Sequence, residues 1–325
     1  MQYAPRFGLV GVGRWGRNIA ACLMHSQFAR LVSMASRNPA VIESFEGRCD
    51  VFPSWKTLIE KGPALDGLII ASPPDTHTMI ALDAIHNGIP VLIEKPLATS
   101  IIDAEAVRAE CEERGIAVMV DFMHLFSPGW RWLRSQLPKV GLLQELWSVS
   151  GNLGPFRKDV TPLWDWAAHD LAMVLALAGR EIAGIHARRK AIEDTRDGIG
   201  EVVGIKLMYP GGLEADIECG NILAAKRREF RAVGADGEIR YDDVAKTGEL
   251  ITDKRRTTVD FGQLDESPLE NVLRTFALVC QGTGQDQDDT LRLGLDTTRL
   301  IAAIESRIGL SETSDWQTVP YQRQA

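Results

Sequence analysis

A glycine turn and a lysine far from it in the chain constrain this sequence more than any other feature. The turn, Gly11-Val12-Gly13-Arg14-Trp15-Gly16, directly follows the apolar run 7–10. The lysine, Lys95, follows the run 91–94 and precedes Pro96. Both runs are typical of buried strands, and in an open α/β sheet ligands gather at the carboxyl ends of the strands. We therefore expect both segments to reach the same crevice.

The 325 residues are enough for two domains, since single domains mostly have about 100–200 residues. A hydrophobic content of 45% and a charged content of 25% are those of a soluble globular protein. The net charge of −8 argues against nucleic acid or an anionic membrane surface as partner. No apolar stretch reaches the ~18 residues of a membrane span. The first strand begins near Arg6 and leaves no room for a signal peptide, so a cytoplasmic protein is expected.

Five scattered cysteines, none in a Cys-x-x-Cys pair, predict reduced thiols rather than a disulfide framework or a zinc site. No metal site is expected.

The first part of the chain alternates short apolar runs with helical patterns, as a parallel βαβ sheet requires. Strands are predicted at 7–10, 31–35, 67–71, 91–94 and 117–121, and helices at 17–25, 39–46, 55–61, 76–87 and 102–114. Gly88 and Gly115 each follow a predicted helix and are expected to end it. Residues 1–122 are thus predicted to form an α/β NAD(P)-binding Rossmann domain with a doubly wound parallel sheet.

The pattern changes after Pro128. Strands are predicted at 142–153, 182–192, 201–209, 213–219, 229–233, 238–241 and 256–261, and helices at 162–178, 267–281 and 289–307. The segment 209–212 and the dipeptide Asp236-Gly237 read as hairpin turns. Residues 123–325 are thus predicted to form an α+β domain with a large, mostly antiparallel, open-faced sheet.

The three glycines of the turn have separable roles in a strand–turn–helix unit that binds a dinucleotide. Gly11 permits the tight turn, Gly13 the approach of the backbone to the pyrophosphate, and Gly16 the packing of helix on strand. Arg14 and Trp15 begin the helix, whose positive dipole end and amide hydrogens then point at the phosphates. The alternative is a glycine-rich turn without a ligand.

The end of the second strand indicates which nicotinamide dinucleotide fits. An acidic residue there would accept hydrogen bonds from the ribose 2′-hydroxyl, but the sequence has Ser36 and Arg37. Serine is a neutral donor, and a planar guanidinium suits both adenine stacking and a 2′-phosphate. NADP is therefore favoured over NAD. The alternative is that Arg37 only covers the adenine face of NAD.

Two further segments are expected beside the cofactor. Ser72 and Pro73 follow the third predicted strand, and His77 stands near the start of the next helix, where a structural role competes with a direct one. Glu94 and Lys95 end the next predicted strand.

Hydride transfer from an alcohol requires a group that holds the substrate oxygen and a group that accepts its proton. Lys95 suits the first task, because an ammonium at a strand end can hydrogen-bond the oxygen and lower its pKa. His169 suits the second. Asp165 stands one helical turn before it and can orient the imidazole, although the pair could also be a purely structural contact.

These motifs, in this order and spacing, resemble the glucose–fructose oxidoreductase/inositol dehydrogenase/MocA (Gfo/Idh/MocA) family over essentially the whole chain. The resemblance rests on the glycine turn, the segment 73–77, Glu94-Lys95-Pro96-Leu97 and Asp165-x-x-x-His169-Asp170. It implies an NAD(P)-dependent oxidoreductase that acts on a sugar, cyclitol or related polyol. It also implies that Lys95, Asp165 and His169 are catalytic, and that the C-terminal sheet forms a homodimer or homotetramer.

The chain departs from the family pattern in the segments expected to contact substrate. Met123 and Leu125 replace polar residues and leave His124 as the substrate contact, and Ala172 replaces an aspartate frequent after the histidine. The segment 163–171 resembles members that process nucleotide-linked sugars.

Three more residues are candidates for contact with the substrate. Trp164 and Trp166 could stack on a sugar, although neighbours on a helix point in different directions, so at most one is expected to do so. Arg157 could bind a carboxylate or phosphate of the substrate, or it could simply be an exposed loop residue.

The alternative to an enzyme is a non-catalytic NAD(P)-binding regulator of the same fold. The presence of all three catalytic candidates favours the enzyme.

Overall fold

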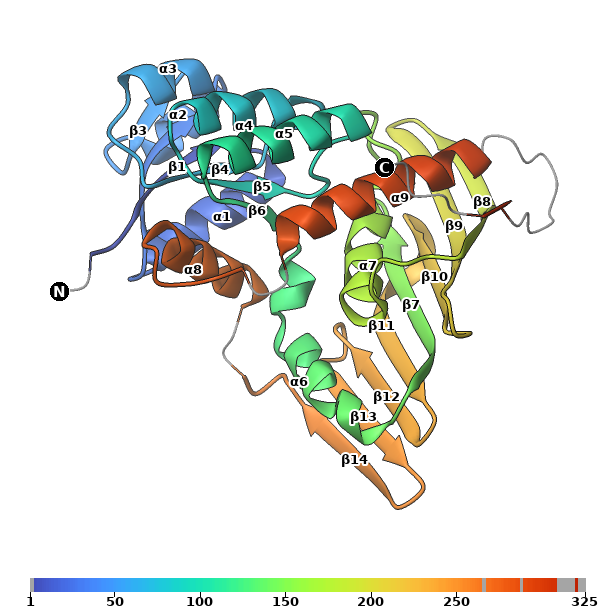
Figure 1. Cartoon of the computed structure of the whole chain (residues 1–325). Helices are drawn as coiled ribbons and strands as arrows, with labels where there is room; N and C mark the ends of the chain where they lie inside the picture. The colour runs from blue at the N-terminus through green and yellow to red at the C-terminus, as the bar shows by residue number, and fades with distance from the viewer. Residues whose placement is uncertain (1–2, 265–266, 287–288, 309–318, 321–325) are drawn as a thin grey trace. The chain divides into compact units, whose positions relative to one another are not determined.

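The computed structural model describes residues 3–264, 267–286, 289–308 and 319–320 (Figure 1). Two compact units make up the chain: residues 1–123 with 267–298, and residues 124–266 with 299–325. The sequence predicted two continuous domains, 1–122 and 123–325. The first break lies close to that boundary, but the segment 267–298 groups with the first unit. The reason is packing: helix α8 (Pro268–Cys280) contacts helix α1 (Arg14–His25), and the ring of Phe276 lies 5.1 Å from that of Phe7.

The first unit is built on a six-stranded parallel sheet in the order β3-β2-β1-β4-β5-β6. The strands are β1 (Arg6–Val10), β2 (Arg30–Ala35), β3 (Asp50–Phe52), β4 (Gly67–Ile70), β5 (Val91–Glu94) and β6 (Val118–Asp121). The connecting helices are α1, α2 (Pro39–Phe45), α3 (Trp55–Lys61), α4 (His77–His86) and α5 (Ile101–Arg114), with a short 3-10 helix, η1 (Pro74–Thr76). The predicted doubly wound sheet is confirmed.

Helices cover both faces of this sheet, α1 and α8 on one and α3, α4 and α5 on the other (Figure 1). The central strands are therefore apolar throughout: Leu9, Leu68, Ile70 and Leu92 are all fully buried. β1, β4 and β5 run in the same direction, so their carboxyl ends meet at one edge of the sheet. Each is followed there by a segment that the sequence singled out.

The second unit is built on a nine-stranded sheet in the order β14-β13-β12-β11-β7-β10-β9-β8-β15, antiparallel except between β7 and β10. The strands are β7 (Leu143–Leu153), β8 (Gly184–Thr195), β9 (Gly198–Met208), β10 (Glu214–Gly220), β11 (Ile222–Gly234), β12 (Gly237–Asp242), β13 (Thr247–Thr252), β14 (Arg255–Asp260) and β15 (Val319–Pro320). The predicted large, mostly antiparallel sheet is confirmed, as are the hairpin turns before β10 and β12.

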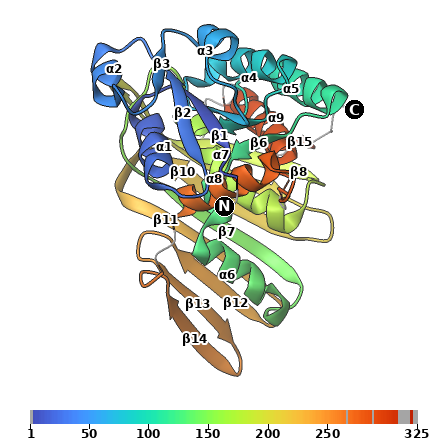
Figure 2. The same ribbon diagram turned by 90° about the vertical axis from the view of Figure 1, so that its left-hand side faces the viewer.

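Helices lie against one face of this sheet: α7 (Pro162–Ala178) packs on β7, β9 and β10, and α6 (Pro128–Gln136) packs on β12 and β13 (Figure 2). The short helices η2 (Met123–Phe126) and η3 (Leu137–Lys139) flank α6, and α9 (Thr290–Ile308) is the last helix among the described residues. The opposite face carries ion pairs between neighbouring strands, such as Lys206–Glu214 and Arg231–Glu238. This half-solvated sheet explains the alternating pattern of its sequence.

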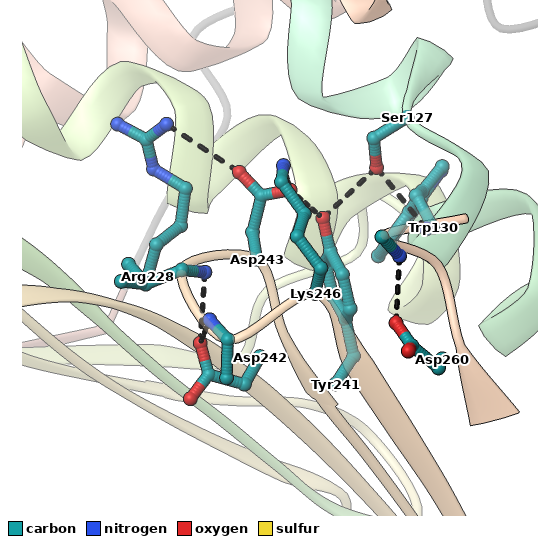
Figure 3. Close-up of polar contacts among 11 residues, drawn as sticks. Ser127, Trp130, Arg228, Tyr241, Asp242, Asp243, Lys246 and Asp260 are labelled. Atoms are coloured by element: carbon teal, nitrogen blue, oxygen red, sulfur yellow. Dashed lines mark hydrogen bonds and ion pairs between the residues drawn. The ribbon is translucent and has the colours of Figure 1, made fainter. Parts of the chain in front are cut away.

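The sequence did not predict α6, because Pro128 and Gly129 look like helix breakers. In the structure Pro128 occupies the first turn, where its missing N–H costs nothing. Ser127 accepts a hydrogen bond from the Trp130 N–H at 3.1 Å, and its Oγ lies 3.0 Å from the Tyr241 hydroxyl, which donates to Asp243 (Figure 3). A Cβ at Gly129 would lie 2.0 Å from the Tyr241 ring. The glycine is therefore required by the packing of β12 on α6.

Candidate active site

The glycine turn after β1 has the geometry expected of a dinucleotide site. Gly11 has a φ of +91°, and a Cβ there would lie 2.4 Å from the Ala71 carbonyl carbon. A Cβ at Gly16 would lie 1.9 Å from the Gly11 oxygen. At Gly13, by contrast, no atom of the described residues comes within 4 Å of the Cβ position. Packing of the protein thus requires the first and third glycines, while the second borders space that a ligand would fill.

The amino terminus of α1 offers its amide hydrogens to that space. Gly13 is the N-cap residue, with no capping side chain, and the described first turn contains no acidic residue. Arg14 is exposed, and Trp15 is partly buried. Uncapped amides and the positive end of the helix dipole suit a pyrophosphate, so the residues present fit a bound dinucleotide.

Ser36 and Arg37 follow directly on β2, at the same edge of the sheet. The Ser36 Oγ accepts a hydrogen bond from the Asn38 N–H at 3.2 Å, and Asn38 in turn caps α2 through the Ala40 N–H. Arg37 is exposed. The end of β2 therefore presents a hydroxyl and a guanidinium, with no carboxylate among residues 33–38.

His77 is buried and connects the two loops that follow β4 and β5. Its Nε2 lies 2.9 Å from the Ser72 carbonyl oxygen and its Nδ1 lies 2.9 Å from the Pro96 carbonyl oxygen. Carbonyl oxygens only accept hydrogen bonds, so both contacts are satisfied together only when both ring nitrogens carry hydrogen. His77 thereby links the Ser72-Pro73 loop to the segment that carries Lys95. The hydroxyl of Ser72 lies 2.6 Å from that of Thr76.

Glu94 and Lys95 end β5, and the Lys95–Pro96 peptide bond is cis. The Glu94 carboxylate accepts the indole N–H of Trp15, so it contacts the first turn of α1. Glu94 also lies opposite Asp121 in the register of β5 and β6. Burial, followed by the charge of Asp121, raises the pKa of Glu94 well above its usual range. Burial likewise raises the pKa of Asp121 to about 6.

In the second unit, α7 presents Asp165, Trp166 and His169 on its partly exposed side. The predicted four-residue spacing places Asp165 and His169 on one face of this helix. The ring of His169 meets that of His124 edge to face, with centroids 4.4 Å apart. The structure thus brings together the predicted acid–base residue and a predicted substrate contact.

Arg157 and Trp164 are already engaged within the second unit. The guanidinium of Arg157 pairs with Asp165 at 3.3 Å and with Asp159 at 2.5 Å. Two carboxylates therefore neutralise the charge that was expected to meet a substrate anion. Trp164 is 5% exposed and donates its indole N–H to Glu305 at 3.0 Å. Of the two tryptophans, Trp166 is the one that shares the face of His169.

Sequence reasoning gave no role to two buried acids beside the candidate residues. Asp170 accepts hydrogen bonds from Ser148 and Ser150 of β7, and burial raises its pKa to about 6. This contact fixes α7 on the sheet next to His169. Asp121 is the other acid. Its position at a strand end on the ligand edge was a usable signal, whereas the partners of Asp170 depend on tertiary packing.

Within the described residues, no group of three or more His, Cys, Asp or Glu side chains is arranged to hold a metal ion. None of the helices in the described part of the chain is both long and apolar enough to cross a membrane.

Comparison with known proteins places this geometry in a family. Residues 5–122 match the model of an oxidoreductase family with an NAD-binding Rossmann fold, GFO_IDH_MocA. A provisionally assigned oxidoreductase from Magnetospirillum magnetotacticum MS-1 is 33% identical, with a TM-score of 0.84 over 93% of this chain and 99% of the other.

Curated relatives match over shorter stretches. UDP-N-acetylglucosamine 3-dehydrogenase from Acidithiobacillus ferrooxidans is 28% identical over 187 residues, 56% of this chain and 57% of its own length. Its solved structure has the same fold, with a TM-score of 0.82 over 95% of this chain and 99% of the other, at 21% identity. Inositol 2-dehydrogenase from Rhizobium meliloti is 28% identical over 227 residues, 65% of this chain and 67% of its own length.

The first of these curated relatives is therefore matched over less than two thirds of its length. The family model, the full-length structural relative and the curated relatives agree with one another and with the motifs of the sequence. This chain belongs to the Gfo/Idh/MocA family of oxidoreductases.

Proposed function

We propose that this protein is an NAD(P)-dependent oxidoreductase that acts on a secondary alcohol, or the matching ketone, of a sugar, cyclitol or sugar derivative. The observation that carries the proposal is the glycine turn, in which Gly13 borders open space in front of an uncapped helix terminus. The relatives that act on UDP-N-acetylglucosamine and on inositol support this substrate class, nucleotide-linked sugars included.

A nicotinamide bound at the glycine turn would accept or supply the hydride. Lys95 holds the substrate oxygen through its ammonium group and stabilises the charge that develops there. His169 takes the hydroxyl proton during oxidation and returns it during reduction. Asp165 orients His169 from one helical turn away, and its own position is fixed by the ion pair with Arg157. His124 and Trp166 contact the substrate.

The cofactor proposed is NADP in preference to NAD, because the end of β2 presents Ser36 and Arg37 where NAD-specific sites have an acid. We further propose a homodimer or homotetramer formed through the open face of the second unit's sheet.

Replacement of Gly13 by leucine tests the cofactor site. Its backbone is extended, with a φ of −74°, and no described atom lies near its Cβ, so the fold should tolerate the side chain. We expect NADPH binding, measured by quenching of tryptophan fluorescence, to be lost while the circular dichroism spectrum is unchanged. Ala245→Leu, at an exposed turn of the second unit, is the control and should bind normally. Unchanged NADPH affinity in Gly13→Leu would remove the glycine turn from the cofactor site.

The second candidate function, a non-catalytic dinucleotide-binding regulator, has the same binding properties. It is distinguished by turnover, which the regulator lacks with every polyol, sugar or nucleotide sugar offered.

A further inference from the structure

Two acids face each other at the ligand edge of the first unit, and the proposed reaction uses neither of them. Glu94 and Asp121 end adjacent parallel strands and are paired in register. Asp121 is 2% exposed, and Glu94 is partly buried beside it. Neighbouring buried carboxylates are costly unless a proton or a cation joins them.

The hydrogen bonds around this pair are incomplete without a proton. Glu94 receives the indole N–H of Trp15. No donor in the described part of the chain makes a well-aligned hydrogen bond to either oxygen of Asp121, and the Met123 N–H has the smallest effect on its pKa. The remaining side chain that can form a hydrogen bond with Asp121 is that of Glu94. Carboxylates only accept hydrogen bonds, so a contact between the two acids needs a proton on one of them.

The charges around the pair agree with a single shared proton. The charged groups that shift the pKa values of both acids are the two acids themselves and the ammonium of Lys95. Two neutral hydrogen-bond donors also contribute: the Trp15 indole to Glu94 and the Met123 N–H to Asp121. Burial raises both pKa values, and Lys95 lowers both. One proton leaves the pair with one negative charge, which balances that of Lys95.

The pair of Glu94 and Asp121 is connected both to the proposed pyrophosphate site and to Lys95. Trp15 is the second residue of α1, whose amino terminus is the proposed pyrophosphate site, and Lys95 follows Glu94 in the chain. A change in the pair therefore acts on the phosphate side through the indole and on the nicotinamide side through the lysine.

We propose that Glu94 and Asp121 are positioning residues that share one proton, and that this proton holds Trp15 and Lys95 in the arrangement that binds the dinucleotide. The proposal rests on the proposed function. When the shared proton is lost, two carboxylates repel each other and add negative charge near the pyrophosphate. Dinucleotide affinity therefore falls as the pH rises and the pair ionises fully.

Asp121→Asn separates this role from simple packing. The asparagine amide donates to Glu94 and leaves one negative charge on the pair wherever Glu94 is ionised, as the shared proton does in the wild-type protein. Asp121→Ala removes the link altogether. Calorimetric titration with NADPH from about pH 7 to about pH 10 starts above the pKa of Asp121, where the pair keeps one proton, and follows the loss of that proton, which the raised pKa of Glu94 governs.

We expect the wild-type Kd to rise with pH, by at most about tenfold per pH unit for a single linked proton. Asp121→Asn should have a Kd close to the neutral-pH value of the wild-type protein, without that dependence. Asp121→Ala should bind more weakly than Asp121→Asn at every pH. Identical pH profiles for the wild-type protein and Asp121→Asn would overturn the proposal.

A measurement without cofactor keeps this result distinct from failure of the proposed function. Infrared spectroscopy of the protein alone should show a protonated carboxyl band at neutral pH that is lost in Asp121→Asn. If the band is present but NADPH does not bind at any pH, the proposed function fails while the shared proton stands. Absence of the band in the wild-type protein overturns the shared proton itself.

Discussion

At the scale of single residues, the glycine turn after β1 and the buried His77 shape the candidate site of the first unit. Packing requires Gly11 and Gly16 of the turn, whereas Gly13 borders space that no described atom fills. For His77 the sequence left a structural and a direct role open. Its bonds to two backbone carbonyls give it a structural role, as a link between the loops after β4 and β5. Such partners lie in other segments and leave no local pattern.

Arg37 tests the cofactor preference. We expect Arg37→Ala to weaken NADP(H) binding by about 1–3 kcal/mol, the range for a charge-assisted hydrogen bond, and to leave NAD(H) binding nearly unchanged. Calorimetric titration with both cofactors measures this. Equal losses for the two cofactors would mean that the arginine only packs on adenine. Arg48, which follows α2, supplies a control substitution of the same kind.

His169 and Lys95 test the proposed chemistry. His169→Ala should lower turnover by about 10²–10⁴ with cofactor affinity unchanged, because it removes only the proton acceptor. Lys95→Ala should be at least as severe, since it removes the charge beside the developing alkoxide. Asp165→Asn should lower turnover by less than His169→Ala does, because it only impairs the orientation and basicity of His169. A His169→Ala variant with near wild-type turnover and the same pH profile would exclude this histidine from proton transfer and favour His124, whose ring lies against it.

At the scale of elements, most helices and strands follow from the sequence; β3, β13, β15 and α6 do not, and three of these have a physical reason. The strand β3 has three residues and is at the edge of its sheet, so it has no period to recognise. The strand β13 contains Gly248, which is a poor strand former, and a Cβ there would lie 2.5 Å from the Trp132 ring. The helix α6 begins with Pro128 and Gly129, and the glycine is required because the Tyr241 ring packs against it. Tertiary contacts decide these three elements.

The attachment of α7 to β7 through Asp170 predicts a pH dependence of stability. Burial raises the pKa of Asp170 to about 6, so the folded state holds the proton more tightly than the unfolded chain. This contribution to stability is complete below the unfolded pKa near 4 and is lost as the pH rises through about 6.

Asp170→Asn should remove that loss, which amounts to roughly 3 kcal/mol for a shift of this size. Urea unfolding at a series of pH values measures the difference between the two proteins, and contributions from other acids cancel in that difference. A difference that stays constant with pH would show that Asp170 does not titrate in this range. Gln144→Asn, at an exposed position of β7, changes no titratable group and should follow the wild-type profile.

At the scale of the whole molecule, both sheet architectures could be predicted from the sequence, but the assignment of residues 267–298 could not. That segment groups with the first unit because Phe276 packs on Phe7 and Gly67, residues far from it in the chain.

The proposed homodimer or homotetramer would form through the open face of the second unit's sheet. The open face of the second sheet carries Trp147, with Arg227 5.6 Å from its ring, beside a hollow of about 400 Å³.

Sedimentation equilibrium tests the proposed assembly. We expect a mass of two or four times 35.8 kDa. Trp147→Glu adds a charge to the open face and should shift the equilibrium toward the single chain, whereas Ile102→Glu, at a position 81% exposed on α5, should not. A wild-type protein that sediments as a single chain at all concentrations would rule out this interface.

The central claim is that the chain moves a hydride between a nicotinamide and a sugar or polyol. The most direct measurement supplies NADPH deuterated at the transferable position, with a panel of keto derivatives of sugars, inositols and nucleotide sugars, and follows the deuterium by mass spectrometry. Deuterium should appear on the former carbonyl carbon of at least one compound, and His169→Ala should lower the transfer by about 10²–10⁴ while NADPH still binds. Tight binding of NADPH with no transfer to any member of the panel would contradict the account and favour the regulator.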